Sequence, residues 1–279
     1  TQGGYQHKPD LPFIPGGDVS GEIAALGDGV SGFAVGDRVV TSRLGGAFAE
    51  YNTYSAATVR KIPQHLDFAS AASVGSAYLT AYVSLVRRAN IQPGEWLLVH
   101  GAAGGVGLAA VDLGKHLGAK VIAAASHDEK LKVIEDKYAP DAIINYTGGF
   151  REKVKEITNG GADVIFDPVG GDVFDESVRC IAFDGRLLVV GFASGRIPEV
   201  KVNMPLIKGF SVVGVRAGEY GRQFPEKGRE NMEAVWKLIE DKAVTPHAHG
   251  VYSLDDWRKA FAEMEERRVV GRVIIDPSL

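Results

Sequence analysis

The segment that most constrains the fold is a glycine-rich turn, Gly101-Ala-Ala-Gly-Gly-Val-Gly107, between two regular elements. The apolar run Trp96-Leu-Leu-Val-His100 before it predicts a strand that is buried on both faces. The residues after the turn predict a helix over 105–118. A strand, a glycine turn and a helix in this order are the setting in which N–H groups at a helix N-terminus bind the diphosphate of a dinucleotide.

The residues of this turn have separate predicted roles. Gly104 lets the backbone approach a pyrophosphate, and Gly107 lets the helix pack closely on the strand. Ala102 stands where the G-x-G-x-x-G motif has its first glycine, so the turn is a variant of that motif. The alternative is a glycine-rich turn that binds no ligand. The residues expected to bind the cofactor here are Ala103, Gly104, Gly105, Val106 and Gly107.

Strands and helices alternate along the chain from Pro93 onward. This alternation is typical of an α/β fold in which parallel βαβ units wind around both faces of one sheet. A helix over about 227–242 and a strand over 272–275 follow, and that strand has no evident partner in the α/β block. Strands are predicted over 96–100, 120–125, 141–145, 163–167, 186–190 and 210–215, and helices over 105–118, 127–138, 150–158 and 172–181.

The first part of the chain has a different pattern, in which glycine-rich turns separate short strands. Strands are predicted over 19–24, 38–41 and 48–52, and this spacing is typical of a small β-barrel or sandwich. Residues 66–90 have the apolar spacing of amphipathic helices. Thr1–Gln6 begin no recognisable element, and we expect the natural chain to extend upstream of them.

The tip of the second predicted strand of the α/β block, 120–125, bears on the choice of cofactor. An NAD site has Asp or Glu there, about 20 residues after the glycine turn, to bind the ribose 2′-hydroxyl. This strand ends instead in Ala125, Ser126 and His127, and Lys130 follows. A hydroxyl and a cation suit a 2′-phosphate, so the sequence favours NADP(H).

Two other interpretations of this strand tip stay open. Ser126 and Glu129 have the spacing of a helix capping box, in which case the serine hydroxyl only caps the helix. Lys130 is then a solvated helix charge. Asp128 is then a first-turn residue that suits the helix dipole, unless a rotated loop makes it the ribose ligand.

Composition excludes several classes of function. Lys and Arg number 31 against 35 Asp and Glu, and the formal net charge of -4 points to no nucleic-acid or membrane partner. The one cysteine, Cys180, cannot form an internal disulfide, and we expect it to fill apolar space in a helix. No apolar run approaches the roughly 18–20 residues that span a bilayer. The expected setting is therefore reducing and cytoplasmic.

Several segments resemble one protein family. Pro12-Phe-Ile-Pro-Gly-Gly-Asp-Val-Ser-Gly21 and Gly29-Val-Ser-Gly-Phe-Ala-Val-Gly-Asp-Arg-Val39 resemble stretches of the medium-chain dehydrogenases/reductases. The turn Gly101–Gly107, together with Ile144-Asn-Tyr146 and Phe166-Asp-Pro-Val-Gly170, resembles the zinc-independent quinone oxidoreductase branch of that family. The resemblance runs the whole length of the chain.

The resemblance implies a division of the chain into domains. Residues 1–80 would form a GroES-like β-barrel catalytic domain whose first strands are missing, because the family's chains begin upstream of Thr1. Residues 81–220 would form a Rossmann domain with a doubly wound parallel sheet, and 221–279 would return to the catalytic domain. Missing barrel strands leave sheet edges exposed, so we expect residues 1–279 alone to be poorly soluble.

Zinc is not expected. The metal-dependent branch of the family carries a catalytic Cys, a Gly-His-Glu and a four-cysteine lobe, whereas this chain has Gly17-Asp18 in place of Gly-His-Glu and lacks the lobe. His247 and His249 lie in a predicted loop, and no two histidines have i, i+4 spacing on a helix. A catalytic zinc needs about three protein ligands, and we find no plausible set.

The resemblance also implies roles for single residues. Thr80 is expected beside the nicotinamide as the catalytic residue, with a hydroxyl bonded only to its own helix as the alternative. Tyr146 is expected beside the 2′-phosphate with Ser126 and Lys130, or else as an ordinary tyrosine at a strand end. No general acid is identified.

Two more groups are expected at the carboxyl edge of the sheet, where ligands bind. Val169 and Gly170 follow the fourth strand, and Gly191 and Phe192 follow the fifth. The alternative for Phe192 is an ordinary core residue. Arg272 is expected to reach a cofactor phosphate or, alternatively, only a surface carboxylate.

The chemistry that suits a site without zinc is hydride transfer to a quinone or an enone. Such acceptors leave a delocalised anion, whereas an unactivated ketone gains more from a Lewis acid. The leading hypothesis is therefore an NADPH-dependent quinone oxidoreductase acting on a small molecule. The tyrosines that could serve as a proton donor by chemistry alone are Tyr51, Tyr54 and Tyr82.

Two alternatives remain. One is an NADPH-dependent 2-enoyl or alkenal reductase, including an enoyl-CoA reductase, for which Arg216, Arg222, Lys227 and Arg229 would form a basic groove. The other is a nucleotide-binding structural or regulatory protein without turnover. The apolar strand over 210–215 would be a sheet edge, and the resemblance implies that two copies pair there as a homodimer.

Overall fold

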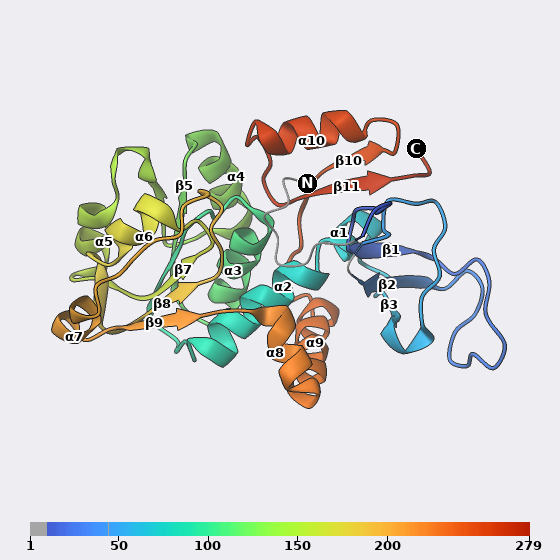
Figure 1. Ribbon diagram of the computed structural model, residues 1–279, viewed down its shortest axis with the longest axis horizontal. Coiled ribbons are helices and arrows are strands. Elements are labelled where there is room, and N and C mark those ends of the chain that lie inside the picture. Colours follow the sequence, from blue (N-terminus) through green and yellow to red (C-terminus); the bar gives the residue numbers. More distant parts are fainter. Residues whose placement is uncertain (1–9, 44) are drawn as a thin grey trace.

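The computed structural model describes residues 10–43 and 45–279, so Thr1–Gln6 lie outside the described residues. Its largest unit is a 6-stranded sheet with the order β6-β5-β4-β7-β8-β9, in which all neighbours are parallel. The order reverses between β4 and β7, and the predicted doubly wound α/β sheet is confirmed (Figure 1). The strands are β4 (Trp96–Val99), β5 (Lys120–Ala125), β6 (Ala142–Asn145), β7 (Ala162–Asp167), β8 (Ile181–Val189) and β9 (Ser211–Gly214).

Helices cover both faces of this sheet. Because successive residues of a strand point to opposite faces, Leu97 joins one hydrophobic core with residues of α3 and α4, and Leu98 joins another with residues of α5 and α6. Strands buried on both faces are what the continuous apolar runs predicted. The helices are α3 (Gly105–His116), α4 (Asp128–Tyr138), α5 (Arg151–Thr158) and α6 (Gly171–Ser177), with a short turn η3 (Tyr146–Gly148) after β6.

The predicted helix over 172–181 is wrong at its end. Helix α6 ends at Ser177, and the chain enters β8 at Ile181 instead of at residue 186. The Cys180 carbonyl accepts a hydrogen bond from the Ala162 amide at 2.9 Å, which draws this segment into the sheet ladder. Cys180 therefore lies in the connection and not in a helix, although its side chain is buried as expected.

The first part of the chain forms a 3-stranded antiparallel sheet with the order β1-β2-β3. The strand predicted over 48–52 does not form. Gly45 and Gly46 before it have φ of +82° and +90°, and the Phe48 ring packs edge-on against Phe261 with centroids 6.3 Å apart. The elements are β1 (Asp18–Glu22), β2 (Arg38–Ser42), η1 (Ala56–Thr58), β3 (Arg60–Lys61), α1 (Phe68–Ala72) and α2 (Gly75–Tyr82), which continues as the π-helical η2 (Val83–Arg88).

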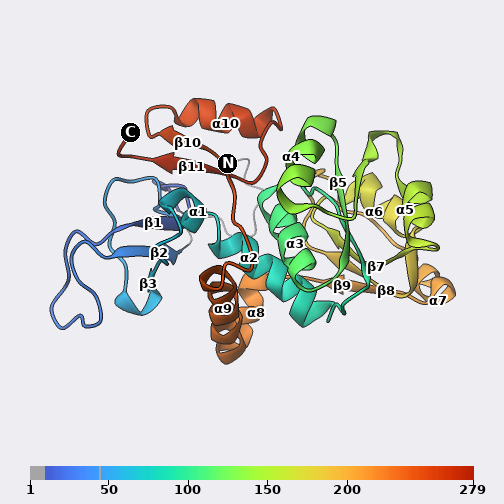
Figure 2. The ribbon, with the colours of Figure 1, turned by 180° about the vertical axis from the view of Figure 1, so that it is seen from behind.

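The last part of the chain contains a second small sheet. The predicted strand near residue 273 is β11, and it pairs in parallel with β10 to form a 2-stranded sheet. Both strands lie beside β1 and α1 (Figures 1 and 2). No helix in the described residues has the length and apolar character needed to cross a membrane. The elements are α7 (Asn203–Lys208), α8 (Ala217–Gln223), α9 (Pro225–Glu240), β10 (Ala248–Ser253), α10 (Trp257–Glu265) and β11 (Arg272–Asp276).

Candidate cofactor site

The glycine-rich turn lies at the carboxyl end of β4, where the strand order reverses. The turn closes with a hydrogen bond of 2.8 Å from the Gly104 amide to the Gly101 carbonyl, and Gly101 has a φ of +55°. A Cβ on Gly107 would lie 2.2 Å from the Gly101 carbonyl oxygen, so only glycine lets α3 pack this closely. Gly104 is exposed, and a Cβ there would meet only the Gly101 oxygen, at 3.4 Å.

Arg272, at the start of β11, lies over this turn. A Cβ on Gly105 would lie 2.7 Å from Arg272 Cδ and 3.1 Å from its Nε. The Gly271 amide donates to the Ala103 carbonyl at 2.8 Å, which fixes the start of β11 against the turn. The buried Nε of Arg272 has no hydrogen-bond partner in the described part of the chain. An unpaired guanidinium N–H above the N-terminus of α3 fits the diphosphate of a dinucleotide.

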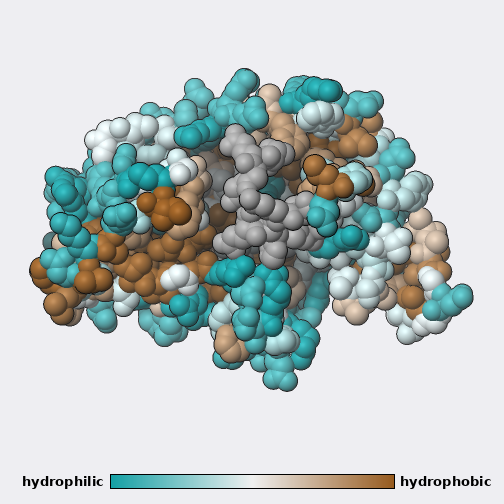
Figure 3. Space-filling model, in the orientation of Figure 1, coloured by the Kyte–Doolittle hydropathy of each residue, from teal (hydrophilic) through white to brown (hydrophobic). Residues whose placement is uncertain are grey.

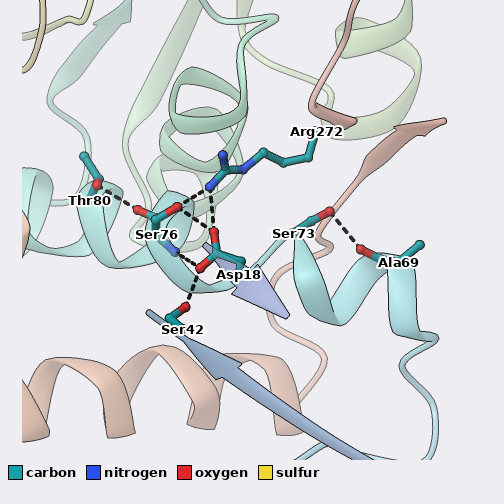
Figure 4. Close-up of polar contacts among 7 residues, drawn as sticks. All are labelled: Asp18, Ser42, Ala69, Ser73, Ser76, Thr80 and Arg272. Carbon is teal, nitrogen blue, oxygen red and sulfur yellow. Dashed lines mark hydrogen bonds and ion pairs between the residues drawn. The ribbon is translucent and has the colours of Figure 1, made fainter. Parts of the chain in front are cut away.

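Arg272 also forms an ion pair with the carboxylate of Asp18. The alternative considered for Arg272 was a contact with a surface carboxylate only. Its Nη2 donates to Asp18 Oδ2 at 3.0 Å, and the Ser76 hydroxyl accepts from the same nitrogen (Figure 4). The Asp18 side chain is only 13% exposed, so this partner is not a surface carboxylate. The guanidinium therefore spans the distance between the first sheet and the glycine turn.

The structure brings Ser126, Lys130 and Tyr146 together at the tip of β5. Burial raises the pKa of Tyr146, while a hydrogen bond with Ser126 and the charge of Arg267 oppose that shift. Burial lowers the pKa of Lys130, and the positive charge of Arg267 lowers it further. Two cations, Lys130 and Arg267, beside a tyrosine and a serine suit a phosphate dianion.

Arg267 was missed by the sequence analysis. It lies in the turn between α10 and β11 with a φ of +55°, more than a hundred residues along the chain from Lys130. The only signal in the sequence is a basic pair, Arg267-Arg268, just before the last strand, and such pairs are common on solvated surfaces. Its place beside Tyr146 depends on the return of the chain to the sheet.

The capping box considered for Ser126 does not form. Helix α4 begins at Asp128 with His127 as its N-cap and no side-chain cap, and the Ser126 hydroxyl instead contacts His127 Nδ1 at 2.8 Å. Asp128 stays in the first turn of the helix, where its carboxylate accepts a hydrogen bond of 2.7 Å from Asn145. The Ser126 hydroxyl therefore lies at the strand tip with His127 and Tyr146 and does not cap the helix.

The loops after β7 and β8 form one wall beside the turn. The Asp167 carboxylate accepts hydrogen bonds from the amides of Val169 at 2.8 Å and Gly170 at 2.9 Å. Gly170 has a φ of +69°, and a Cβ there would lie 3.0 Å from the Phe192 ring. Phe192 is 41% exposed, so it is not a core residue, and Gly191 beside it packs on the loop after β7 through the Pro168 carbonyl.

Thr80 lies in α2 one turn after Ser76. Its hydroxyl donates to the Ser76 carbonyl at 2.7 Å, which is the alternative considered for it (Figure 4). The hydroxyl oxygen keeps its lone pairs, so it can still accept a hydrogen bond from a ligand amide. Of the candidate tyrosines, Tyr51 is 79% exposed and Tyr54 has a buried hydroxyl without a partner among the described residues.

His100, directly before the glycine turn, is a buried residue for which the sequence suggested no role. Its Nε2 contacts the Ser177 hydroxyl at 2.9 Å, and that hydroxyl donates to the Val173 carbonyl at 2.7 Å. Ser177 therefore accepts, and His100 carries its proton on Nε2. Burial lowers the pKa of His100 from 6.5 to about 3, which keeps the ring neutral.

This burial predicts a loss of stability in acid. Below pH 6.5 the unfolded chain protonates His100 and the folded chain does not, so the free energy of unfolding falls until about pH 3. The expected slope is about 1.4 kcal/mol per pH unit from this group. Urea unfolding at pH 7 and pH 5 should show a smaller loss for His100→Phe than for the wild type. Equal losses in both proteins would contradict this role.

In residues 10–43 and 45–279, no three His, Cys, Asp or Glu side chains gather in a group that could hold a metal ion. His247 lies in the loop before β10, with its Nδ1 3.0 Å from Lys137 Nζ. His249 lies in β10 and not in a loop, and its Nδ1 accepts a hydrogen bond from the Val270 amide at 3.3 Å. Burial and the charge of Lys137 lower the pKa of His247.

Comparison with known proteins identifies the family. The family described as "Alcohol dehydrogenase GroES-like domain" matches residues 1–64, and the one described as "Zinc-binding dehydrogenase" matches residues 105–241. A "Quinone oxidoreductase-like protein 2 homolog" of Nematostella vectensis is 41% identical over 98% of this chain and 76% of its own length.

Solved structures share the whole fold. A mycobacterial protein crystallised with NADPH is 33% identical with a TM-score of 0.87, over 98% of this chain and 85% of that chain. A quinone oxidoreductase of Pseudomonas syringae is 29% identical with a TM-score of 0.82, over 96% of this chain and 83% of that chain. Enoyl reductases also share the fold. The chain is a member of the quinone oxidoreductase branch of the medium-chain dehydrogenase/reductase superfamily of oxidoreductases.

Proposed function

We propose that this protein reduces quinones with NADPH and without zinc. The observation that carries the proposal is the pair of cations, Lys130 and Arg267, beside Tyr146 at the tip of β5. A carboxylate at this strand tip would instead select the ribose hydroxyls of NAD. The relative crystallised with NADPH and the relative named for quinones support the cofactor and the substrate class.

The chain's own residues would bind and orient the cofactor. The glycine turn and Arg272 would hold the diphosphate, and Ser126, Lys130, Tyr146 and Arg267 the 2′-phosphate. NADPH, when bound, supplies the hydride. The loops of Val169–Gly170 and Gly191–Phe192 would fix the position of the nicotinamide, and Thr80 can accept a hydrogen bond from its amide. Thr80 thus has a positioning task in this proposal and moves no proton.

The choice of a quinone over an enoyl-CoA as substrate rests on the contacts of the basic residues Arg216, Arg222 and Lys227. A CoA groove would need free cations, but Arg216 and Arg222 both form ion pairs with Glu219, at 3.8 and 2.9 Å. Lys227 lies over the Phe224 ring at 5.2 Å. These contacts describe a solvated helix surface better than a nucleotide groove.

The test is the oxidation of NADPH by the full chain with a para-quinone, a 2-alkenal and a short enoyl-CoA, each with and without a metal chelator. We expect the quinone to react fastest and the chelator to change nothing. A faster enoyl-CoA or alkenal would make the protein a double-bond reductase. Tight NADPH binding with no turnover across the panel would support a binding protein instead.

We also propose a homodimer through the edge strand β9. Strand β9 has a single neighbour, β8, in the described sheet, and its Val212 is 39% exposed. Figure 3 shows apolar side chains gathered over α7 and β9. An edge that is both open and apolar is usually covered by a partner. Large exposed apolar residues occur in β8, in α7 and in the segment between them, namely Phe183, Ile197, Val202, Leu206 and Ile207.

The dimer proposal predicts that Val212→Lys converts the protein to a monomer, because a buried lysine at the pairing edge has no partner. Light scattering should give half the wild-type mass at micromolar concentration. The matched control is Val35→Lys, which changes a residue that is 65% exposed in the first sheet's turn region and should leave the mass unchanged. A monomeric wild type, or a dimeric Val212→Lys, would contradict the proposal.

We also propose a division into domains and a cytoplasmic setting. The division at residues 80 and 220, with 221–279 returning to the catalytic domain, is supported by the place of β10 and β11 beside β1. The cytoplasmic setting is supported by the single cysteine, Cys180, which is buried.

A further inference from the structure

Asp18 is the centre of a polar cluster that joins β1, β2, α2 and β11 (Figure 4). Its Oδ1 accepts hydrogen bonds from the Ser42 hydroxyl and from the Ser76 amide, the latter at 3.2 Å. Its Oδ2 accepts from the Ser76 hydroxyl at 2.7 Å and from Arg272 Nη2 at 3.0 Å. Both carboxylate oxygens are thus occupied by donors from three different elements.

The chain has little freedom around this carboxylate. A Cβ on Gly75 would lie 2.3 Å from Asp18 Oδ1, so α2 begins directly against it. The carboxylate also receives the Ser76 amide in the first turn of α2, where the helix dipole favours a negative charge. Asp18 is therefore fixed in place before any ligand arrives.

The fixed carboxylate sets the orientation of Arg272. Asp18 and Ser76 engage the Nη2 end of the guanidinium, while the buried Nε is left without a partner among the described residues. The guanidinium is planar and rigid. Contacts that fix its Nη2 atom therefore also fix the direction in which its other N–H groups point. The stem of Arg272 crosses Gly105, so the free edge lies at the N-terminal turn of α3.

We propose that Asp18 is a positioning residue for cofactor binding, which holds Arg272 so that its free N–H edge meets the diphosphate of NADPH. This rests on the proposed function in that Arg272 must contact that diphosphate. Asp18 itself does not touch the cofactor in this account. Ser42 and Ser76 serve Asp18 in turn by fixing its two oxygens.

The direction in which Asp18→Asn shifts the dissociation constant for NADPH distinguishes a positioning role of Asp18 from an effect of its charge alone. A carboxylate near a diphosphate repels it, so removing the charge of Asp18 would tighten NADPH binding if charge alone mattered. If Asp18 orients Arg272, Asp18→Asn weakens NADPH binding, because the guanidinium loses its anchor. The two accounts therefore predict opposite shifts of the dissociation constant.

The experiment is a double-mutant cycle on the full chain, with NADPH binding followed by fluorescence. We expect Asp18→Asn to raise the dissociation constant about tenfold in the wild type and less than twofold in Arg272→Gln. Inhibition by adenosine 2′-monophosphate, which lacks the diphosphate, should change less than twofold in every variant. Ser42→Ala is the milder variant if Asp18→Asn folds poorly, and we expect a two- to threefold loss from it.

Three results would overturn the proposal. They are tighter NADPH binding by Asp18→Asn, an equal loss in both backgrounds of the cycle, and a parallel loss of adenosine 2′-monophosphate binding. A wild-type chain that binds no NADPH contradicts the proposed function itself. The proposal and the proposed function thus fail on different measurements.

Discussion

Replacing Gly107 by alanine is expected to destabilise the whole protein, whereas the same change at Gly104 should impair only cofactor binding. A Cβ at residue 107 would lie 2.2 Å from the Gly101 carbonyl oxygen and 3.0 Å from Ala102 Cα. Both neighbours are backbone atoms that cannot rotate away, so α3 must move off β4. We expect a loss of at least about 3 kcal/mol in the free energy of unfolding, at the upper end for overpacked cores.

Gly104 is the matched control, because it belongs to the same turn and accepts a Cβ without strain. It is exposed, it sits in an ordinary extended conformation with a φ of -76°, and its nearest contact for a Cβ is 3.4 Å away. A methyl group there would occupy the space that a diphosphate needs to approach the backbone. We expect Gly104→Ala to keep the wild-type melting temperature within about two degrees and to weaken NADPH binding about tenfold or more.

Thermal unfolding and NADPH titration of the two variants check this pair of predictions. A Gly107→Ala protein as stable as the wild type would show that the helix does not pack on the turn as described. Full NADPH affinity in Gly104→Ala would place the diphosphate somewhere other than the turn.

Removing both cations at the tip of β5 should change the cofactor preference more than any other substitution. In Lys130→Ala/Arg267→Ala, we expect the kcat/KM for NADPH to fall about a hundredfold. Each charge-assisted contact to the 2′-phosphate is worth about 1.5 kcal/mol, and 1.4 kcal/mol is a factor of ten. The kcat/KM for NADH should stay within about twofold, because NADH has no 2′-phosphate.

Lys132→Ala offers a matched control on the same helix. Lys132 is exposed and pairs with Glu135 and Asp136, at 3.2 and 2.7 Å, so it should not contribute to cofactor choice. Raising the salt concentration should reduce the NADPH preference of the wild type and of Lys132→Ala, but not of the double variant. A double variant that still prefers NADPH would contradict the site.

The sequence allowed the α/β sheet and the turn to be predicted because both depend on local patterns. The apolar run Trp96–Val99 is short and is followed directly by a glycine turn, which together indicate a buried strand that leads into α3. The positions of Ser126 and Lys130 at the tip of β5 could be predicted for the same reason, because both residues follow a strand whose end is clear from the sequence.

What the sequence did not reveal depends on contacts between distant segments. Arg267, which follows α10, lies near Lys130 only in the folded chain. Asp18 and Arg272 form an ion pair although most of the sequence separates them. The pairing of β10 with β11 is likewise parallel and non-local. The strand predicted over 48–52 does not form, and its Phe48 packs instead against Phe261 of α10, a residue far away in the sequence.

The measurement that tests the central claim most directly is the kcat/KM of the full chain for NADPH and for NADH, with one para-quinone as acceptor. The cluster of Ser126, Lys130, Tyr146 and Arg267 at the tip of β5 predicts turnover with NADPH and a preference over NADH of at least about tenfold. Equal or better use of NADH would contradict the 2′-phosphate site. Quinone reduction by neither cofactor would contradict the proposed function.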